Sequence, residues 1–345
     1  MSAAGAMPAA VFEGAGRLAI RERPRPVLER PSDVVLDVEA CGICGSDLAI
    51  LAVPPGHPAT PGVVLGHEMV GRVAQAGDEA GDLRPGDRVV VAPNVSCGAC
   101  RYCRRGLRLH CERFTTHGIF VDGGLAPHVR VPVSACHPIA AGLPRHVAAL
   151  AEPLSTVVHG VRRAEPFPGE TAVVIGAGPV GLMYIALLRL AGLRVVALEP
   201  AERRAALARA MGAAEVLDPR ADDAGAVVRD LTDGLGADLL VDAVGSQLGP
   251  ALELVRTAGR IVLFGVNAQA RTEVAQEHIT RDELTLLGAF VGQDVFPTAI
   301  ALLESGEIDW EPFVTHHIGL DELPDAVEEL RAGRAVKVEV EFGTS

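Results

Sequence analysis

Lysine is almost absent from this sequence, and aromatic residues are scarce. Lysine and arginine together number 31 among 345 residues, and Lys337 is the single lysine, whereas aspartate and glutamate number 44. The formal net charge of −13 argues against nucleic acid and against an anionic membrane surface as partners, because both would repel the chain. The sequence also lacks a run of about 18 uncharged apolar residues, so we expect no transmembrane helix.

The remaining composition is typical of a soluble globular protein. Apolar residues make up 49% of the chain and charged residues 22%, and the length predicts two domains. Residues 1–17 have neither a basic segment nor a long apolar core, so they do not resemble a signal peptide.

The composition and the pattern of apolar residues change near the middle of the chain. Residues 1 to about 150 are rich in glycine, proline and valine, and short runs such as 33–39 and 87–91 predict a β-rich domain with many turns. From residue 171 onward, short apolar runs alternate with helical stretches, which predicts a parallel sheet covered on both faces. The expected strands there are 171–175, 194–198, 238–242, 260–264 and 284–290, and the expected helices include 180–191 and 201–211. The last fifty residues predict helices at 296–305 and 322–332 and a strand at 335–342.

Four closely spaced cysteines are the strongest local signal. Their spacing is C-x2-C-x2-C-x7-C, and four thiolates this close can surround one tetrahedral zinc ion. Such a site has no open position, so its role would be structural; free or disulfide-linked thiols are the alternative. Thiolate ligands require a reducing compartment, which favours the cytoplasm. The four residues are Cys97, Cys100, Cys103 and Cys111.

A glycine-rich turn follows the expected strand at 171–175 and opens the expected helix, as a dinucleotide-binding motif requires. In G-x-G-x-x-G the first glycine allows the turn, the second admits the pyrophosphate and the third lets helix and strand pack closely. Glu199 ends the next strand, where a carboxylate binds the ribose 2′-hydroxyl and repels a 2′-phosphate. This favours NAD over NADP, although Arg203 and Arg204 lie nearby and could in principle accept a 2′-phosphate. The motif residues are Gly176, Gly178, Pro179, Val180 and Gly181.

A second metal site is indicated by residues in two glycine-rich turns. Cys44 is followed by Gly45, Ser46 and Asp47, and His67 stands between Gly66 and Glu68. A thiolate and an imidazole suit zinc, and a catalytic zinc takes three protein ligands and leaves one position open.

These motifs carry a family resemblance. Cys-Gly-Ser-Asp from Cys44, Gly-His-Glu from Gly66, residues 86–89, the four cysteines, Glu-Pro-Leu from Glu152 and the dinucleotide motif occur in family order. Over almost its whole length the chain resembles the zinc-dependent medium-chain dehydrogenases/reductases of the alcohol, polyol and threonine dehydrogenase group. The resemblance implies an α/β fold with a GroES-like β-barrel catalytic domain at 1–153, its structural-zinc lobe at 96–111, a doubly wound Rossmann domain at 154–290, and a return to the catalytic domain at 291–345.

The resemblance also implies roles for individual residues. Zinc would be held by Cys44, His67 and Glu152, and Glu68 is the nearby carboxylate that can approach the metal when ligands exchange. Asp47 would accept a hydrogen bond from the other ring nitrogen of His67. Ser46 would carry the proton, Thr156 would pack against the nicotinamide, and Val244 and Val266 would contact the edge of the cofactor. We interpret Cys41 as a small buried side chain, with a role as a metal ligand as the alternative.

The implied reaction is reversible hydride transfer from a secondary alcohol to NAD, with zinc as the Lewis acid that favours the alkoxide. A zinc-free NADPH quinone or enone reductase of the same superfamily, or a non-catalytic NAD-binding protein, is the alternative. Family members also predict a homo-oligomer, a tetramer or a dimer, formed at the sheet edge 260–264 and 284–290.

The substrate is less well defined. Many members have a histidine where this chain has Ala49, so the proton must leave by water or by another group such as His57. The arginine that polyol dehydrogenases carry in the segment 290–294 is absent. We expect a mostly apolar pocket and a secondary alcohol that is a polyol, a cyclitol or an amino alcohol. The expected lining is Ala49, Ile50, residues 114–120 with His117 as the polar element, and Phe290.

Overall fold

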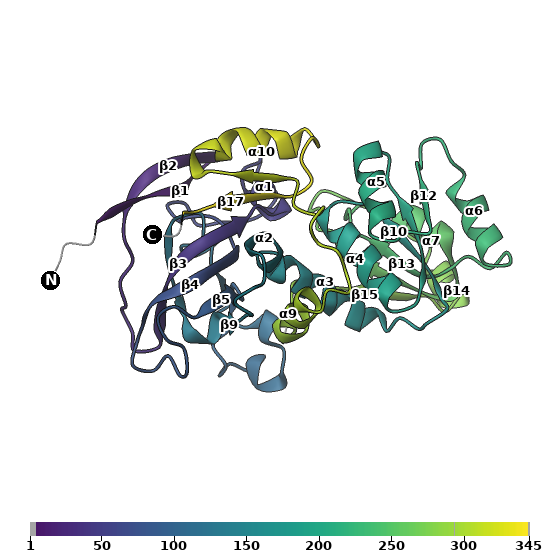
Figure 1. Cartoon of the computed structure of the whole chain (residues 1–345). Coiled ribbons are helices and arrows are strands. Elements are labelled where there is room, and N and C mark those ends of the chain that lie inside the picture. Colours follow the sequence, from purple (N-terminus) through teal and green to yellow (C-terminus); the bar gives the residue numbers. More distant parts are fainter. Residues whose placement is uncertain (1–4, 293, 344–345) are drawn as a thin grey trace. The chain divides into compact units, whose positions relative to one another are not determined.

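The computed structural model describes residues 5–292 and 294–343, and these form two compact units (Figure 1). The first unit contains the chain up to Pro153 and again from Phe296 onward, and the second unit contains Leu154–Val295. The sequence placed these changes near residues 154 and 290.

The first unit is built on a mostly antiparallel sheet. Its strand order is β16-β17-β3-β4-β5-β9, and β8 also pairs with β3. The central strand β3 is almost entirely buried, because both of its faces are covered. This architecture confirms the predicted GroES-like β domain. The strands are β3 (Asp33–Gly42), β4 (Glu68–Ala76), β5 (Arg88–Val91), β8 (His128–Pro132), β9 (Cys136–Pro138), β16 (His316–Ile318) and β17 (Val338–Glu341).

Shorter elements complete this unit. The strands β1 and β2 form a separate hairpin, and the very short strands β6 and β7 pair beside the four cysteines. The expected terminal strand and the expected helix before it are each shorter than the sequence suggested. These elements are β1 (Ala6–Gly14), β2 (Arg17–Pro24), β6 (Asn94–Val95), β7 (Thr115–Thr116), α1 (Gly45–Ile50), α2 (Arg145–Ala148), α9 (Phe296–Glu304) and α10 (Leu323–Arg331). The helix α3 (Ala151–Ala164), which the sequence analysis did not predict, spans the change from the first unit to the second.

The second unit is a six-stranded parallel sheet with the order β12-β11-β10-β13-β14-β15. The strand order reverses between β10 and β13, and folds of this kind bind ligands at the carboxyl ends of the strands at this point. This confirms the predicted Rossmann domain. Its elements are β10 (Thr171–Ile175), α4 (Pro179–Leu190), β11 (Arg194–Leu198), α5 (Glu202–Ala210), β12 (Glu215–Leu217), α6 (Ala224–Leu231), β13 (Ala237–Asp242), α7 (Leu248–Leu254), β14 (Val255–Leu263), α8 (Gln276–Arg281) and β15 (Thr285–Gly288).

One detail of the expected sheet edge is wrong. The segment 260–264 falls largely in β14, which lies between β13 and β15, so only β15 presents a free edge on that side. The order of parallel strands is set by the helical crossovers and not by the apolar runs, which read alike for inner and outer strands.

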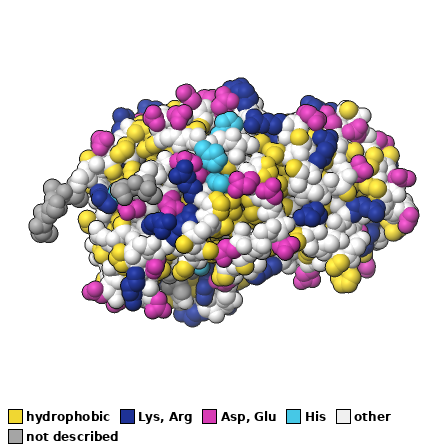
Figure 2. Space-filling view, in the orientation of Figure 1, with side chains coloured by type: hydrophobic (Ala, Val, Ile, Leu, Met, Phe, Trp, Pro, Cys, Tyr) yellow, Lys and Arg dark blue, Asp and Glu magenta, His cyan; other side chains and the backbone are white. Residues whose placement is uncertain are grey.

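The distribution of charged side chains on the surface agrees with the acidic composition of the chain. On the face drawn in Figure 2, acidic and basic side chains are interspersed and form no continuous basic patch. Within the described ranges, no helix combines the length and the apolar character needed to cross a membrane.

Candidate metal and dinucleotide sites

Three potential metal ligands meet where α1 begins and β4 begins. Cys44 is the residue before α1, and its backbone N–H donates to Asp47 Oδ2 at 2.8 Å. His67 follows Gly66, whose φ of +92° only glycine adopts readily, and Glu68 is the first residue of β4. One ligand atom from each of Cys44, His67 and Glu68 lies within 4.8 Å of the others.

Buried polar atoms around this group lack hydrogen-bond partners. His67 Nδ1, Asp47 Oδ1 and Glu68 Oε1 have none among the described residues, although their side chains are at most 5% exposed. The expected bond between Asp47 and His67 is not formed, because Oδ1 lies 3.7 Å from Nδ1. Unpaired buried groups are costly, and a sulfur, nitrogen and oxygen donor set suits zinc. These residues therefore fit a zinc ion.

The charges of this group influence one another. Burial lowers the pKa of His67, but the nearby carboxylate of Asp47 and the thiol of Cys44 outweigh burial and raise it well above its ordinary value. This rise reflects the negative charge that surrounds the imidazole.

Ser46 is positioned beside the imidazole of His67. Its Oγ lies 3.3 Å from His67 Nε2. The alternative proton acceptor His57 is partly buried, and its Nδ1 lies 2.8 Å from the carbonyl oxygen of Pro58. The loop that carries His57 contacts Ala49, which stands where many family members have a histidine. The N–H of Gly56 in this loop donates to Ala49 O at 2.9 Å.

Lys337 is a member of this site that the sequence analysis did not identify. Its ammonium group donates to Ile43 O at 3.1 Å and forms an ion pair with Glu68, and both side chains are at most 3% exposed. Burial lowers the pKa of Lys337, but the charge of Glu68 outweighs burial and raises it. The sequence contained a signal for this role, because the single lysine of the chain stands between two valines, Val336 and Val338.

Glu152 lies near this group without belonging to its tightest part. It is the second residue of α3 and 7% exposed, and it is not among the three residues whose ligand atoms lie within 4.8 Å. Burial raises its pKa to about 7, while the charge of His67 opposes the increase. Its role as a zinc ligand stays a prediction.

Cys41 is fully buried in the strand that leads to this group. Burial raises the pKa of its thiol well above the ordinary value, so it is held protonated. It belongs to none of the potential ligand groups found among the described residues.

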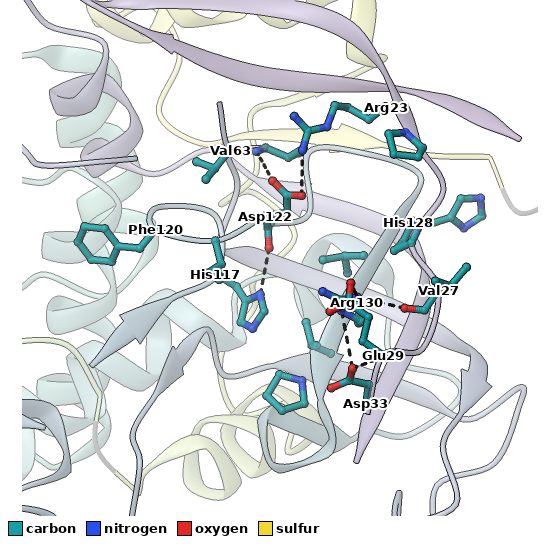
Figure 3. A pocket seen from close by; sticks show the side chains of 18 of the residues that line it. Arg23, Val27, Glu29, Asp33, Val63, His117, Phe120, Asp122, His128 and Arg130 are labelled. Atoms are coloured by element: carbon teal, nitrogen blue, oxygen red, sulfur yellow. Dashed lines mark hydrogen bonds and ion pairs between the residues drawn. The ribbon is translucent and has the colours of Figure 1, made fainter. Parts of the chain in front are cut away.

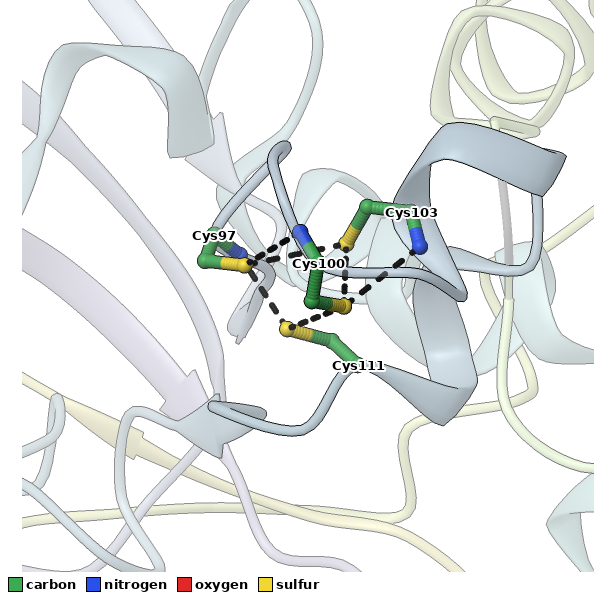
Figure 4. A group of neighbouring side chains, drawn as sticks. All are labelled: Cys97, Cys100, Cys103 and Cys111. Carbon is green, nitrogen blue, oxygen red and sulfur yellow. Dashed lines mark hydrogen bonds between the residues drawn. The ribbon is translucent and has the colours of Figure 1, made fainter.

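The four cysteines converge as the spacing predicts (Figure 4). Sulfur–sulfur distances are 3.5 Å between Cys100 and Cys103, 3.9 Å between Cys100 and Cys111, and 4.0 Å between Cys97 and Cys103. Four Zn–S bonds of about 2.3 Å in a tetrahedron would place the sulfurs about 3.8 Å apart. A disulfide needs about 2.05 Å, and all seven cysteines are free.

Backbone N–H groups prepare these sulfurs for a metal. The N–H groups of Cys97 and Arg113 donate to Cys111 Sγ at 3.3 and 3.2 Å, and that of Cys100 donates to Cys97 Sγ at 3.4 Å. N–H bonds from Ala99 and Cys100 lower the pKa of Cys97 to about 5. Burial raises the pKa of Cys103 to about 11, so the thiolate form that binds zinc is favoured at Cys97 and not at every sulfur of the cluster.

The glycines after β10 have the environments that dinucleotide binding requires. Gly176 has a φ of +88°, Gly178 begins α4 with open space where a side chain would be, and a side chain at Gly181 would collide with the carbonyl oxygen of Gly176. Pro179 and Val180 form the first turn of α4, whose N-terminal N–H groups can bind phosphate.

Glu199 follows β11 and is 3% exposed. Its Oε2 accepts from the N–H of Ala177 at 2.9 Å, and its Oε1 accepts from that of Ala201 at 2.9 Å. Arg204 Nη2 lies 3.0 Å from Glu199 Oε1, so the charge of this arginine is compensated by the carboxylate.

The other expected cofactor residues are also placed by the second unit. Val244 and Val266 follow β13 and β14 and are 47% and 72% exposed, whereas Thr156 is buried in α3. Asp242, which the sequence analysis did not single out, accepts three backbone N–H bonds from Val244, Gly245 and Gln247 and shapes this loop.

A cavity of about 940 Å³ in the first unit includes part of the expected substrate pocket (Figure 3). Thr115, His117 and Phe120 line it, and His117 Nδ1 donates to Asp122 O at 3.0 Å. Its lining contains none of the potential ligands Cys44, His67, Glu68 and Glu152. Of the expected substrate segment, Phe290 is 49% exposed and Gln293 lies outside the described residues.

Comparisons with known proteins agree with both units. Residues 30–141 match the family "Alcohol dehydrogenase GroES-like domain", and residues 179–305 match "Zinc-binding dehydrogenase". The chain is 33% identical to D-arabinitol dehydrogenase 1 of Uromyces fabae, with 97% of each chain covered. It is 35% identical to an erythritol/L-threitol dehydrogenase of Mycolicibacterium smegmatis, with 90% of each covered.

A solved structure has the same fold. This zinc-binding dehydrogenase of Sinorhizobium meliloti 1021, bound to NADP, superposes with a TM-score of 0.91 at 32% identity, and 98% of this chain and 100% of that chain are covered. The family implies zinc and a nicotinamide dinucleotide as cofactors. The chain therefore belongs to the zinc-type medium-chain dehydrogenases/reductases and is an oxidoreductase that acts on alcohol groups.

Proposed function

We propose that this protein is a zinc-dependent, NAD-linked dehydrogenase that oxidises a secondary alcohol of the polyol, cyclitol or amino-alcohol class to a ketone. The observation that carries the proposal is the group of Cys44, His67 and Glu68 beside Ser46, in which His67 Nδ1 and Glu68 Oε1 are buried without a hydrogen-bond partner among the described residues. A catalytic metal accounts for this arrangement better than packing does, because packing leaves these atoms uncompensated.

The zinc ligands in this proposal are Cys44, His67 and Glu152, and Glu68 is held beside them by Lys337. A zinc ion bound there would act as a Lewis acid toward the substrate hydroxyl. The ion pair gives Glu68 a cationic partner of its own, so this carboxylate is available for ligand exchange without being a permanent ligand.

Ser46 carries the substrate proton in this proposal. Its hydroxyl can accept one hydrogen bond and donate another, and it lies 3.3 Å from His67 Nε2. The methyl group of Ala49 cannot continue a relay, so the proton passes to water or to His57.

The hydride acceptor is NAD in this proposal. Glu199 sits at the end of β11, and the nearest basic group, Arg204, is already paired with it. A 2′-phosphate would meet a buried carboxylate instead of a free cation, which disfavours NADP. Thr156, Val244 and Val266 would contact the cofactor.

The substrate class rests on the relatives and on the pocket residues. Two relatives are named for open-chain polyols, D-arabinitol and erythritol or L-threitol, which supports a polyol first. Because the segment 290–294 lacks arginine, this chain would orient its substrate by other groups.

Assembly and location complete the proposal. Zinc bound by Cys97, Cys100, Cys103 and Cys111 would be structural, and these thiolates require a reducing compartment such as the cytoplasm. The free edge of β15 supports a homo-oligomer, a tetramer or a dimer, formed by edge pairing.

The test combines metal content with turnover. We expect two zinc ions per chain at the two family sites, and NAD reduction at 340 nm with at least one member of a panel of polyols, cyclitols, amino alcohols and simple secondary alcohols, with NADP in parallel. Zinc in the four-cysteine site alone would favour a zinc-free quinone or enone reductase. Loaded zinc and bound NAD without turnover on any alcohol would favour a non-catalytic NAD-binding protein.

A further inference from the structure

A third group of potential metal ligands lies on the outer strands of the first unit. β16 and β17 run parallel, and His317 is the register partner of Glu339. Glu339 and Glu341 are two residues apart on β17, so their side chains project from the same face of the sheet. The strand geometry thus brings one imidazole and two carboxylates together, and one ligand atom from each lies within 4.8 Å of the others.

The distances between these atoms match a shared metal ion. His317 Nδ1 lies 3.1 Å from Glu341 Oε1 and 3.7 Å from Glu339 Oε1. Metal–ligand bonds of about 2.0–2.1 Å at tetrahedral angles would separate two donor atoms by about 3.3–3.4 Å. Small side-chain rotations would therefore bring these donors to bonding distance from one ion.

Glu339 provides the independent indication of a missing cation. Its side chain is 1% exposed, and neither carboxylate oxygen has a hydrogen-bond partner among the described residues. A carboxylate buried in this way is costly unless a cation compensates it or a proton neutralises it, and burial raises the pKa of Glu339 to about 8. His317 at 3.7 Å is the nearest ion-pair partner found for it, and that distance is too long for a hydrogen bond.

The group is open to solvent on one side. The side chains of His317 and Glu341 are 42% and 28% exposed, so an ion can reach the buried carboxylate past them. Arg145 is the main competitor, because its guanidinium is paired with Glu341. The ring of His146 stands 5.5 Å from that of His317, edge to face, and adds a second imidazole to the surroundings.

We propose that His317, Glu339 and Glu341 bind one divalent transition-metal ion, with Zn²⁺ as the best match, at a site separate from the Cys44 group and from the four cysteines. An imidazole nitrogen favours Zn²⁺ over Mg²⁺ and Ca²⁺, which prefer all-oxygen sites. Three protein ligands leave a position for water. The ion would join the edge strand β16 to β17.

The experiment counts zinc on the full-length protein. Wild type and variants are dialysed against buffered Zn²⁺ over a range of free concentrations, and zinc per chain is measured after each step. His317→Ala removes one exposed ligand with little risk to folding. His316→Ala is the matched control, because His316 is the adjacent histidine and its Nδ1 contacts Thr315 Oγ1 at 2.9 Å.

We expect wild type and His316→Ala to bind one zinc ion more than His317→Ala, or to bind that ion at least tenfold more tightly. Glu339→Gln should show the same loss as His317→Ala. Arg145→Gln should bind the additional ion more tightly than wild type, because the competing cation is gone. Equal zinc content and affinity in wild type and His317→Ala would overturn the proposal.

The number of zinc ions per chain also shows whether a failure concerns this third site or the metal sites of the proposed function. Three ions in wild type and two in His317→Ala support both proposals. Two ions in both proteins leave the two family sites intact and overturn the third site. Two ions in wild type and one in His317→Ala support the third site and contradict one of the family sites.

Discussion

Replacing Lys337 by methionine should destabilise the first unit strongly. Methionine keeps much of the volume but removes the ammonium group, which leaves Glu68 buried without its ion-pair partner and Ile43 O without its 3.1 Å hydrogen bond. Removing one partner of a buried ion pair costs about 3–5 kcal/mol. For a unit of this size that cost lowers Tm by about 6–20 °C.

Thermal unfolding of the purified variant, followed by circular dichroism at a fixed scan rate, measures this loss. Glu68→Gln combined with Lys337→Met removes both charges and should recover part of it, since a neutral pair no longer leaves a bare charge in the interior. The control is Arg281→Met, which breaks an exposed ion pair with Glu277. Exposed pairs contribute about 0–1 kcal/mol, so this control should change Tm little.

The reasoning fails if Lys337→Met unfolds within about 2 °C of wild type, a shift that corresponds to less than about 1 kcal/mol. It also fails if the double variant is no more stable than the single variant, because the penalty would then not come from an uncompensated Glu68.

Three further predictions concern the metal sites, the cofactor and pH. Cys44→Ser should abolish alcohol oxidation with the fold and the zinc of the four cysteines retained, whereas Cys103→Ser should mainly lower Tm or assembly; metal analysis beside activity separates them, and full activity in both would contradict the assignments. Glu199→Gln should reduce the preference for NAD over NADP at least tenfold in kcat/KM, about 1.4 kcal/mol, because the repulsive charge is removed; an unchanged ratio would show that another group selects the cofactor. Burial lowers the pKa of His117, so the folded state holds it neutral while the unfolded state takes up a proton below about pH 6.5. Its contribution is present above that pH and lost as the pH falls, so His117→Gln should make Tm fall less steeply between pH 7 and 5, and identical slopes would refute this.

Motifs whose residues are close in sequence were predictable in detail. The spacing from Cys97 to Cys111 already brings four sulfurs to one point, because a short segment with tight turns has few other arrangements. The same holds for the turn from Gly176 to Gly181, where backbone conformation and close packing demand glycine locally. The resemblance of these motifs to one family also anticipated the two kinds of sheet.

Contacts between distant strands were decided by the tertiary structure. Lys337 reaches Glu68 only because β17 pairs with β3, and β3 pairs with β4. The meeting of His317 with Glu339 depends on the parallel register of β16 and β17, and a shift of one residue would send one side chain to the opposite face. Neither register is encoded by spacing along the chain. The sequence by itself therefore determined the family, the fold class and the local motifs, whereas the burial of the single lysine and the third ligand group arose from packing.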